Sequence, residues 1–224
     1  MSKDIMNELK LEELRKYFLQ YTKKAYQLLP KMNKPKILDI GCGSGLPTIE
    51  LAKLSEGEII GIDIDQDALN ELNEKASTLG LSDRVKAENC SLFKINFPIE
   101  SFDIIWAEGA IAPIGFEGAL RKWRRLLKPN GYMVLHDDLG NKEEKLKIIP
   151  ECGYKLIDYF QLPDDEWWVE YYEPLEKRIK ELSAKYGKDP NFLDVIKQHQ
   201  DEINECKRNP NVFRSIYFII QKTN

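Results

Sequence analysis

The sequence lacks several features that mark membrane and secreted proteins. No apolar stretch approaches the roughly 18–20 residues that a membrane span needs. The N-terminal stretch MSKDIMNELKLEELRKY is charged throughout and has no apolar centre of the kind found in a signal peptide. We therefore expect a cytoplasmic protein.

Cysteine is also scarce, and the chain has no excess of basic residues, with 33 Lys and Arg against 37 Asp and Glu. The four cysteines lie far apart without a C-x-x-C pair, so we expect reduced thiols, no disulfide framework and no metal. A net charge of −4 and a pI of about 5.5 argue against a basic nucleic-acid-binding face. The basic run 122–128, KWRRLLK, is interpreted as a solvated helix face with cations near the helix C-terminus.

Short apolar segments alternate along the chain with amphipathic ones. Alternation of this kind indicates an α/β fold, a mostly parallel sheet with helices on both faces. Asp65 is expected to cap the second helix, and 128–131 (KPNG) to form a turn before the fifth strand, with Asn130 tolerating positive φ. The predicted strands are 37–40, 58–64, 85–89, 102–107, 132–136 and 154–160, and the helices between them are 47–54, 67–79, 115–127 and 141–150.

Residues 163–211 interrupt this alternation. They predict one helix over 174–187 and a second that is capped by Asp189 and opened by Pro190. Strand character returns at 212–222. We thus expect an N-terminal helical cap (1–34), a core (35–162), a helical lid inserted between the last two strands (163–211) and a final core strand (212–224).

The segment ILDIGCGSG (37–45) is a strand followed by a glycine-rich turn and a helix, which brings backbone N–H groups against a ligand. The dinucleotide fingerprint G-x-G-x-x-G would need glycine at position 46, where the chain has Leu46. The next strand ends in Asp63, where a carboxylate can accept both hydroxyls of a ribose. Glycine turns also join strands to helices for packing reasons alone, so the loop by itself leaves both interpretations open.

Four segments in this order, ILDIGCGSG with GIDID, then FDIIWAEGAI and LLKPNGYMVL, resemble the class I S-adenosylmethionine-dependent methyltransferases. The small-molecule branch called methyltransferase type 11 is the most similar in pattern. The resemblance covers about residues 35–160 and the last strand. It implies a Rossmann-like seven-stranded sheet whose last strand lies antiparallel between the fifth and sixth.

The resemblance also implies S-adenosylmethionine as cofactor and S-adenosylhomocysteine as product. An acid beside the loop suits a ligand with an ammonium and a sulfonium, and is awkward beside a pyrophosphate. Cys90-Ser91 stands where the family commonly has Gly-Asp, which leaves adenine recognition to the Ser91 hydroxyl or to the backbone. The implied cofactor residues are Asp39, Gly41, Cys42, Gly43 and Gly45 for the methionine end, Asp63 for the ribose, and Ile64, Ser91 and Leu92 beside the adenine, with Glu108 at the same edge.

Methyl transfer from a sulfonium mainly needs the acceptor to be held against the methyl carbon, and a base only when the acceptor arrives protonated. Glu108, His136 and Asp137 follow the fourth and fifth strands and are the catalytic candidates. For each, an ordinary strand-end or helix-start role stays open.

The segment 164–176, DDEWWVEYYEPLE, combines acids with aromatic residues and has no base. Such side chains can form a box for a cation, or can simply pack the insertion. His199 on the second lid helix is either a ligand contact or a hydrogen-bonded core histidine. The substrate candidates are Tyr17, Tyr21, Trp167, Trp168, Tyr171, Tyr172 and His199.

The function expected is methylation of a small molecule, with no nucleic-acid or membrane partner. Methylation of RNA or protein is an alternative, disfavoured by the acidic pI and by AEGA where an Asn-Pro-Pro-Tyr-like motif would stand. A non-catalytic S-adenosylmethionine-binding protein or partner subunit is another. The oligomeric state, monomer or homodimer, is left open.

Overall fold

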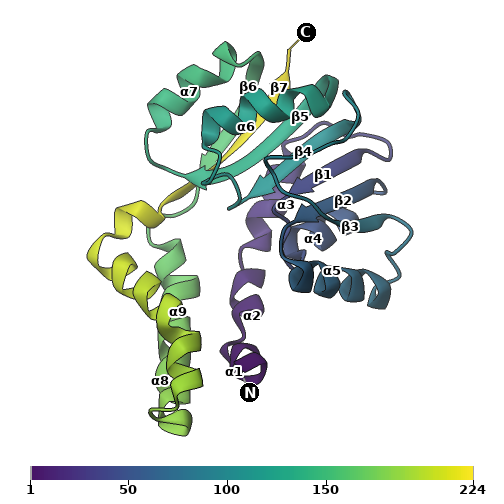
Figure 1. Cartoon of the computed structure of the whole chain (residues 1–224). Coiled ribbons are helices and arrows are strands. Elements are labelled where there is room, and N and C mark those ends of the chain that lie inside the picture. The colour runs from purple at the N-terminus through teal and green to yellow at the C-terminus, as the bar shows by residue number, and fades with distance from the viewer. Residues whose placement is uncertain (1, 224) are drawn as a thin grey trace. The chain divides into compact units, whose positions relative to one another are not determined.

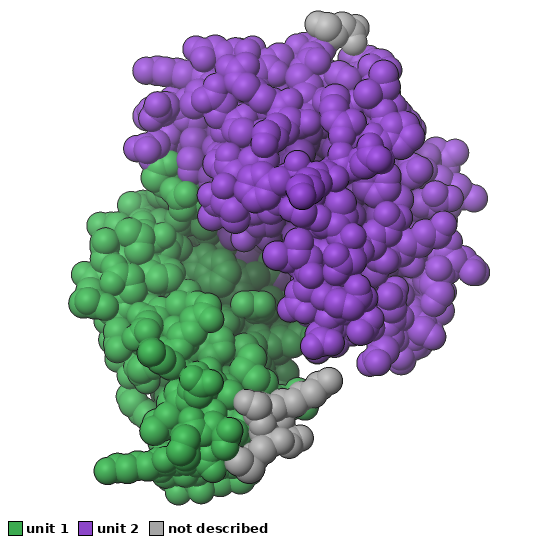
Figure 2. Space-filling model, viewed as in Figure 1, with its two compact units in different colours: residues 1–18, 138–140, 161–215 green, residues 19–137, 141–160, 216–224 purple. Residues whose placement is uncertain are grey.

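A computed structural model describes residues 2–223, with side chains from residue 5 onward. The chain forms two compact units, shown in different colours in Figure 2. We call residues 1–18, 138–140 and 161–215 the helical unit, and residues 19–137, 141–160 and 216–224 the sheet unit. The segment expected as an N-terminal helical cap, residues 1–34, contributes to both units, since one ends at Phe18 and the other begins at Leu19.

A seven-stranded sheet has the order β3-β2-β1-β4-β5-β7-β6. The β1–β2, β1–β4, β2–β3 and β4–β5 pairs are all parallel. The strands are β1 (Lys36–Ile40), β2 (Glu58–Asp63), β3 (Val85–Asn89), β4 (Phe102–Glu108), β5 (Leu127–Asp138), β6 (Tyr154–Gln161) and β7 (Ser215–Lys222).

The last strand runs antiparallel to its neighbours, as expected. At one end of the β6–β7 pair the amide of Thr223 donates to the carbonyl of Gly153 (3.0 Å), and at the other end the amide of Leu162 donates to the carbonyl of Ser215 (3.1 Å). The end of each segment is thus paired with the start of the other, which defines an antiparallel pair. The first residues of β7 therefore lie at the edge where the parallel strands end.

Helices of the sheet unit cover both faces of the sheet, α3, α4 and α5 on one and α6 and α7 on the other (Figure 1). The predicted cap of α5 is confirmed, because the Asp65 carboxylate accepts from the amides of Asp67 and Ala68. Strand β1 is buried along Ile37–Ile40, as a strand covered on both faces should be. The helices are α3 (Leu19–Gln27), α4 (Leu46–Leu54), α5 (Gln66–Thr78), α6 (Phe116–Trp123) and α7 (Lys142–Glu151).

The segment KPNG does not precede β5 as a separate turn. It lies within the strand, which starts at Leu127, and the β4–β5 register shifts between Phe102 and Ile104. Asn130 has the expected positive φ, 61°. An irregularity of this kind accommodates extra residues without ending the strand. The prediction was wrong here because turn-forming residues also occur at bulges.

The helical unit contains α1 (Ser2–Leu9), α2 (Leu11–Lys16), α8 (Glu173–Tyr186) and α9 (Pro190–Arg208). The predicted cap of α9 is confirmed, since Asp189 accepts from the amides of Asn191 and Phe192. A π-helical turn, Trp168–Tyr172, leads into α8. Among the described residues, no helix is long and apolar enough to cross a membrane. The apolar interior includes Leu175, Ile179, Leu182, Phe192, Ile196 and Ile203.

Candidate functional site

The candidate site lies at the carboxyl edge of the sheet, in the sheet unit. The glycine loop follows β1 there, and Gly43 has a φ of 51°. A Cβ built on Gly43 meets nothing within 4 Å, so packing inside the protein does not require this glycine. By contrast, a Cβ on Gly41 would lie 2.3 Å from the Cβ of Ala110. Gly43 therefore presents bare backbone that a ligand can approach closely.

Asp63, the last residue of β2, holds the loop. Its Oδ2 accepts from the amide of Gly43 (2.8 Å), and its Oδ1 accepts from the amide of Asp65 (3.0 Å). A carboxylate has about four acceptor positions, so each oxygen keeps one for a further donor. The arrangement fits a ligand that brings two neighbouring hydroxyls.

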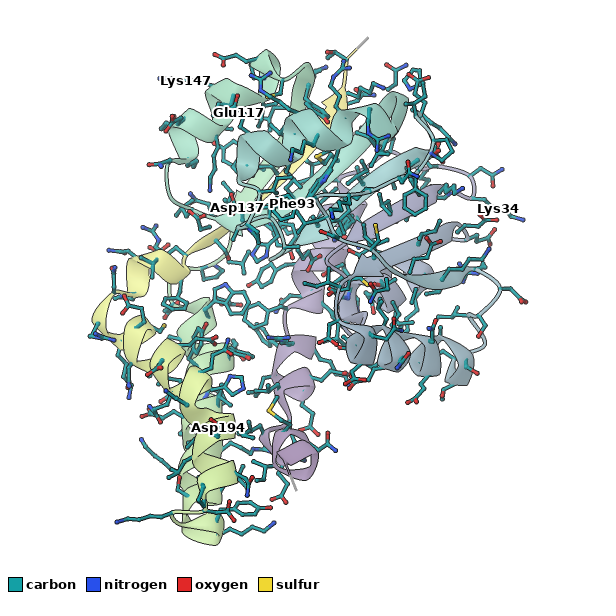
Figure 3. The ribbon with its side chains drawn as sticks, in the orientation of Figure 1. Lys34, Phe93, Glu117, Asp137, Lys147 and Asp194 are labelled. Carbon is teal, nitrogen blue, oxygen red and sulfur yellow. The ribbon has the colours of Figure 1, made fainter. Side chains whose placement is uncertain are left out.

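Exposed apolar side chains follow the ends of β2 and β3. Ile64 is 72% exposed, and Phe93 in the loop after β3, labelled in Figure 3, is 51% exposed. Ser91 accepts from the amide of Phe93 (3.3 Å), and the carbonyl of Leu92 accepts from Trp123 Nε1 (3.3 Å). Sequence reasoning missed Phe93. An aromatic residue two positions after Ser91 was the available signal.

Asp39 lies buried on β1 before the loop, and its Oδ2 accepts from the Thr48 hydroxyl (2.6 Å). Burial is the main cause that raises the pKa of Asp39 to about 7; the hydrogen bond from Thr48 opposes the rise, and the charges of Glu108 and Asp63 add to it. Burial also raises the pKa of Cys42 far above its usual range, which keeps that thiol protonated. Three carboxylates so close together favour a cationic ligand.

Three donors hold Glu108, the last residue of β4, one from the same strand and two from distant elements. Trp106 Nε1 donates to Oε1 (2.7 Å), and the Thr22 hydroxyl of α3 lies 2.9 and 3.2 Å from the two oxygens. The Tyr217 hydroxyl of β7 is the third. Burial raises the pKa of Glu108, and these hydrogen bonds oppose the rise. The helix-start alternative for Glu108 does not apply, because α6 begins at Phe116.

His136 pairs in register with Glu108 and lies within β5, which extends two residues beyond the predicted end of the strand at residue 136. Burial lowers the pKa of His136 to about 4, so the imidazole is neutral at physiological pH. Its ring stacks on Tyr217, with centroids 4.5 Å apart. On the other side Phe160 of β6 stacks with Tyr217 at 5.0 Å.

Asp137 also lies within β5, near its carboxyl end (Figure 3). Its Oδ2 is 2.6 Å from Lys145 Nζ of α7, and both side chains are about 90% buried. An ion pair this enclosed is a structural contact, so the geometry favours Glu108 and His136 over Asp137 as the reactive groups.

The substrate candidates are distributed between the two units. Tyr21 lies in the sheet unit, where its ring is 6.4 Å from that of Phe160. The other six lie in the helical unit. Tyr171 and Tyr172 are buried there, and the Nδ1 atom of His199 is buried with no hydrogen-bond partner among the described residues. These two tyrosines thus belong to the interior of the helical unit.

Sequence reasoning missed Thr22, Thr48 and Tyr217. Tyr217 stands in the apolar run IYFII, which reads as an ordinary core strand. Only the antiparallel insertion of β7 brings this residue to the edge with Glu108. Among the described residues, no group of three or more His, Cys, Asp or Glu side chains is placed to hold a metal ion.

The sequence was compared with families of known proteins. Residues 31–205 match a family model described as a methyltransferase domain. The chain belongs to this methyltransferase family. A sterol 24-C-methyltransferase, ERG6B of Gibberella zeae, is 33% identical over 138 residues, which are 57% of this chain and 36% of that relative. The chain spans less than half the length of the first curated relatives it matches.

Solved structures share the fold of this methyltransferase domain. A methyltransferase from Geobacter sulfurreducens, solved in complex with S-adenosyl-L-homocysteine, has a TM-score of 0.74 at 17% identity and covers 90% of each chain. The (4+2)-cyclase SpnF has a TM-score of 0.76 at 16% identity, covering 91% of this chain and 81% of that chain. The fold thus occurs in proteins named for different reactions, and activity must be argued from the site.

Proposed function

We propose that this methyltransferase domain transfers a methyl group from S-adenosylmethionine to a small-molecule acceptor. The observation that carries the proposal is the Asp63 carboxylate, which fixes the open glycine loop through Gly43 and keeps an acceptor position on each oxygen. The family match and the sterol methyltransferase relative support the same reaction class.

The residues present fit this cofactor. Asp39, Asp63 and Glu108 concentrate negative charge around the loop, which suits an ammonium and a sulfonium and disfavours a phosphate. Asp63 would accept from the ribose hydroxyls, while Ile64 and Phe93 would offer apolar surface to the adenine. Gly41, Cys42, Gly43 and Gly45 would contribute backbone to the methionine end, and Ser91 and Leu92 would lie beside the base. The bound cofactor supplies an electrophilic methyl group.

On the acceptor side, Glu108 and neutral His136 are the groups that would orient the nucleophile or take its proton. Glu108 is fixed by three donors, and burial raises its pKa toward the range useful for a base. His136 offers an uncharged imidazole that Tyr217 and the β5 backbone hold in place. Asp137, tied to Lys145, would support the position of β5.

We further propose that the helical unit selects the acceptor, in the role of the lid expected from the sequence. Tyr17, Tyr21, Trp167, Trp168, Tyr171, Tyr172 and His199 are retained as the acceptor-selecting set. Substitution of Trp168 would then raise the KM for the acceptor and leave cofactor affinity unchanged. An unchanged acceptor KM would argue against this role.

The test of the function is turnover. The protein is incubated with S-adenosylmethionine labelled in the methyl group and with a metabolite extract, and S-adenosylhomocysteine is measured. Labelled small molecules and cofactor turnover are expected. Tight binding without turnover would favour a non-catalytic binding protein or a partner subunit, and label in RNA or protein would favour the macromolecular alternative. We propose a cytoplasmic enzyme without a nucleic-acid partner, consistent with its net charge of −4.

A further inference from the structure

The helical unit contains a cavity of about 310 Å³ that is lined by residues from the start and from the end of the inserted segment. Aromatic rings and charged groups share its wall. Because every lining residue lies between 161 and 215, the cavity belongs to the helical unit alone. The wall includes Trp167, Trp168, Phe213, Asp164, Asp165 and Arg214.

The cavity wall has two carboxylates and one guanidinium group. Arg214 donates to Asp164 Oδ1 at 2.7 Å, so these two charges compensate each other. Asp165 has no ion-pair partner in the part of the chain that the structure describes, and its side chain is exposed. The side chains that line the cavity therefore carry a net charge of −1 next to aromatic surface, which favours a cationic ligand.

One ring of the cavity already attracts a cation of the chain itself. The ammonium of Lys207 lies 5.4 Å from the ring centroid of Trp168, and Glu176 holds that ammonium at 2.7 Å. Since Lys207 is fixed in this way, a ligand in the cavity would meet the accessible surfaces of Trp167 and Phe213 together with the rest of Trp168.

The rings are also held in place. Trp167 stacks on Phe18 with centroids 4.2 Å apart, and its Nε1 donates to Ser215 Oγ at 3.0 Å. Phe213 packs edge-on against buried Tyr172 at 5.0 Å. Trp168 opens a π-helical turn, a rare element that is frequent at functional sites. A fixed aromatic wall loses little conformational entropy when a ligand binds.

We propose that this cavity binds a small organic ammonium ion, with its alkyl groups against the three rings and its charge facing Asp165. An alkylated ammonium suits the site because it needs few hydrogen-bond acceptors and has the apolar surface that the rings cover. The inference extends the proposed role of Trp167 and Trp168 in acceptor selection, but it does not depend on methyl transfer.

The test compares two probes of the same shape by calorimetry on the full chain. Choline is one, and the other is its uncharged carbon analogue, in which a tert-butyl group replaces the trimethylammonium group. Choline is expected to bind saturably, and at least about tenfold more tightly than the uncharged analogue. Equal affinities for the two probes would show that the cavity binds apolar surface without selecting for charge, which would contradict the proposal. Absence of choline binding would also contradict it.

Variants locate the binding. Asp165→Asn and Trp168→Leu are each expected to weaken choline binding about three- to thirtyfold. The matched control is Asp194→Asn. Asp194 is an exposed carboxylate of α9, labelled in Figure 3, that lines a neighbouring groove sharing only Phe213 with this cavity, and its substitution should leave the affinity unchanged. Choline binding should also persist in Asp63→Ala, which removes the proposed ribose contact. Equal effects of Asp165→Asn and Asp194→Asn would contradict the assignment.

Discussion

The imidazole of His136 stacks on the phenol ring of Tyr217, with ring centroids 4.5 Å apart and an interplanar angle of 24°. His136 stands near the end of β5 and Tyr217 near the beginning of β7. Only an antiparallel last strand brings these two positions to one edge of the sheet. The same tyrosine hydrogen-bonds to Glu108, so one residue of β7 positions both candidate groups of the acceptor side.

We predict that Tyr217→Phe lowers the rate of methyl transfer about tenfold, because Glu108 loses one of the donors that orient it. The free energy of unfolding should fall by about 1.5 kcal/mol, the contribution of a hydrogen bond to a charged group. Tyr154→Phe is the control, since its hydroxyl donates to the backbone carbonyl of Leu120 away from the site (3.0 Å). For both variants, transfer assays measure the rate and chemical denaturation measures the free energy of unfolding. Equal transfer rates in the two variants would contradict the role of Tyr217.

The glycine loop offers a matched pair of substitutions. Gly43 and Gly80 both have positive φ, 51° and 67°, and both have open space around an added Cβ. Alanine at either position should cost about 1 kcal/mol of stability through backbone strain. Only Gly43→Ala should also weaken S-adenosylmethionine binding, by about tenfold, because its methyl group would occupy the face that the ligand approaches. Unchanged affinity in Gly43→Ala would remove the loop from the cofactor site.

Cofactor binding should depend on pH through Asp39. A bound cation favours the carboxylate form and lowers its pKa, so binding below about pH 7 requires release of a proton. S-Adenosylmethionine affinity should therefore be about tenfold weaker at pH 6 than at pH 8. His136, with a pKa of about 4, stays neutral over this range and contributes nothing. Calorimetry at the two pH values measures the difference, and Asp39→Asn should abolish it.

Asp39 should also make the stability of the ligand-free protein depend on pH. Between about pH 4 and pH 7 folded Asp39 retains a proton that the unfolded chain has released. Its contribution to the free energy of unfolding is therefore complete below about pH 4 and is lost as the pH rises through 7. The thermal shift produced by the cofactor should consequently be larger at pH 8 than at pH 6. A larger shift at pH 6 would contradict this linkage.

The pair formed by Asp137 and Lys145 should matter for stability. Lys145→Met removes the cation paired with a carboxylate that is about 90% buried, and we expect a loss of about 3 kcal/mol in the free energy of unfolding. Lys128→Met breaks a pair with Asp103 whose side chains are 43% and 29% exposed, and should cost at most about 1 kcal/mol. Denaturant titration compares the two. Equal losses would show that Asp137 is not held as the structure indicates.

Local patterns in the sequence predicted the parts of the fold that depend on neighbouring residues. The caps Asp65 and Asp189 are such cases, because an N-cap bonds amides two or three residues away. Positive φ at Asn130 is another. The KPNG segment was assigned wrongly, since a turn and a bulge use the same residues and only pairing with β4 separates them.

Local patterns likewise predicted some residues of the candidate site and missed others. Glycines and acids at strand ends, such as Gly43 and Asp63, are recognisable from their spacing alone. Thr22 and Tyr217 meet at Glu108 from positions 86 and 109 residues away in the chain, and no local pattern marks them. Their roles follow from tertiary packing, and in particular from the placement of β7 beside β5.

The most direct test of the account is calorimetric titration of S-adenosylmethionine into the wild type, Asp63→Ala and Asp65→Ala. Asp63→Ala should weaken binding by about 2–3 kcal/mol, because it removes a charged acceptor from two hydroxyls. Asp65→Ala, which removes only the cap of α5, should cost about 1 kcal/mol of stability and leave the affinity as it is. Full affinity in folded Asp63→Ala, or no binding to the wild type, would contradict the proposed site.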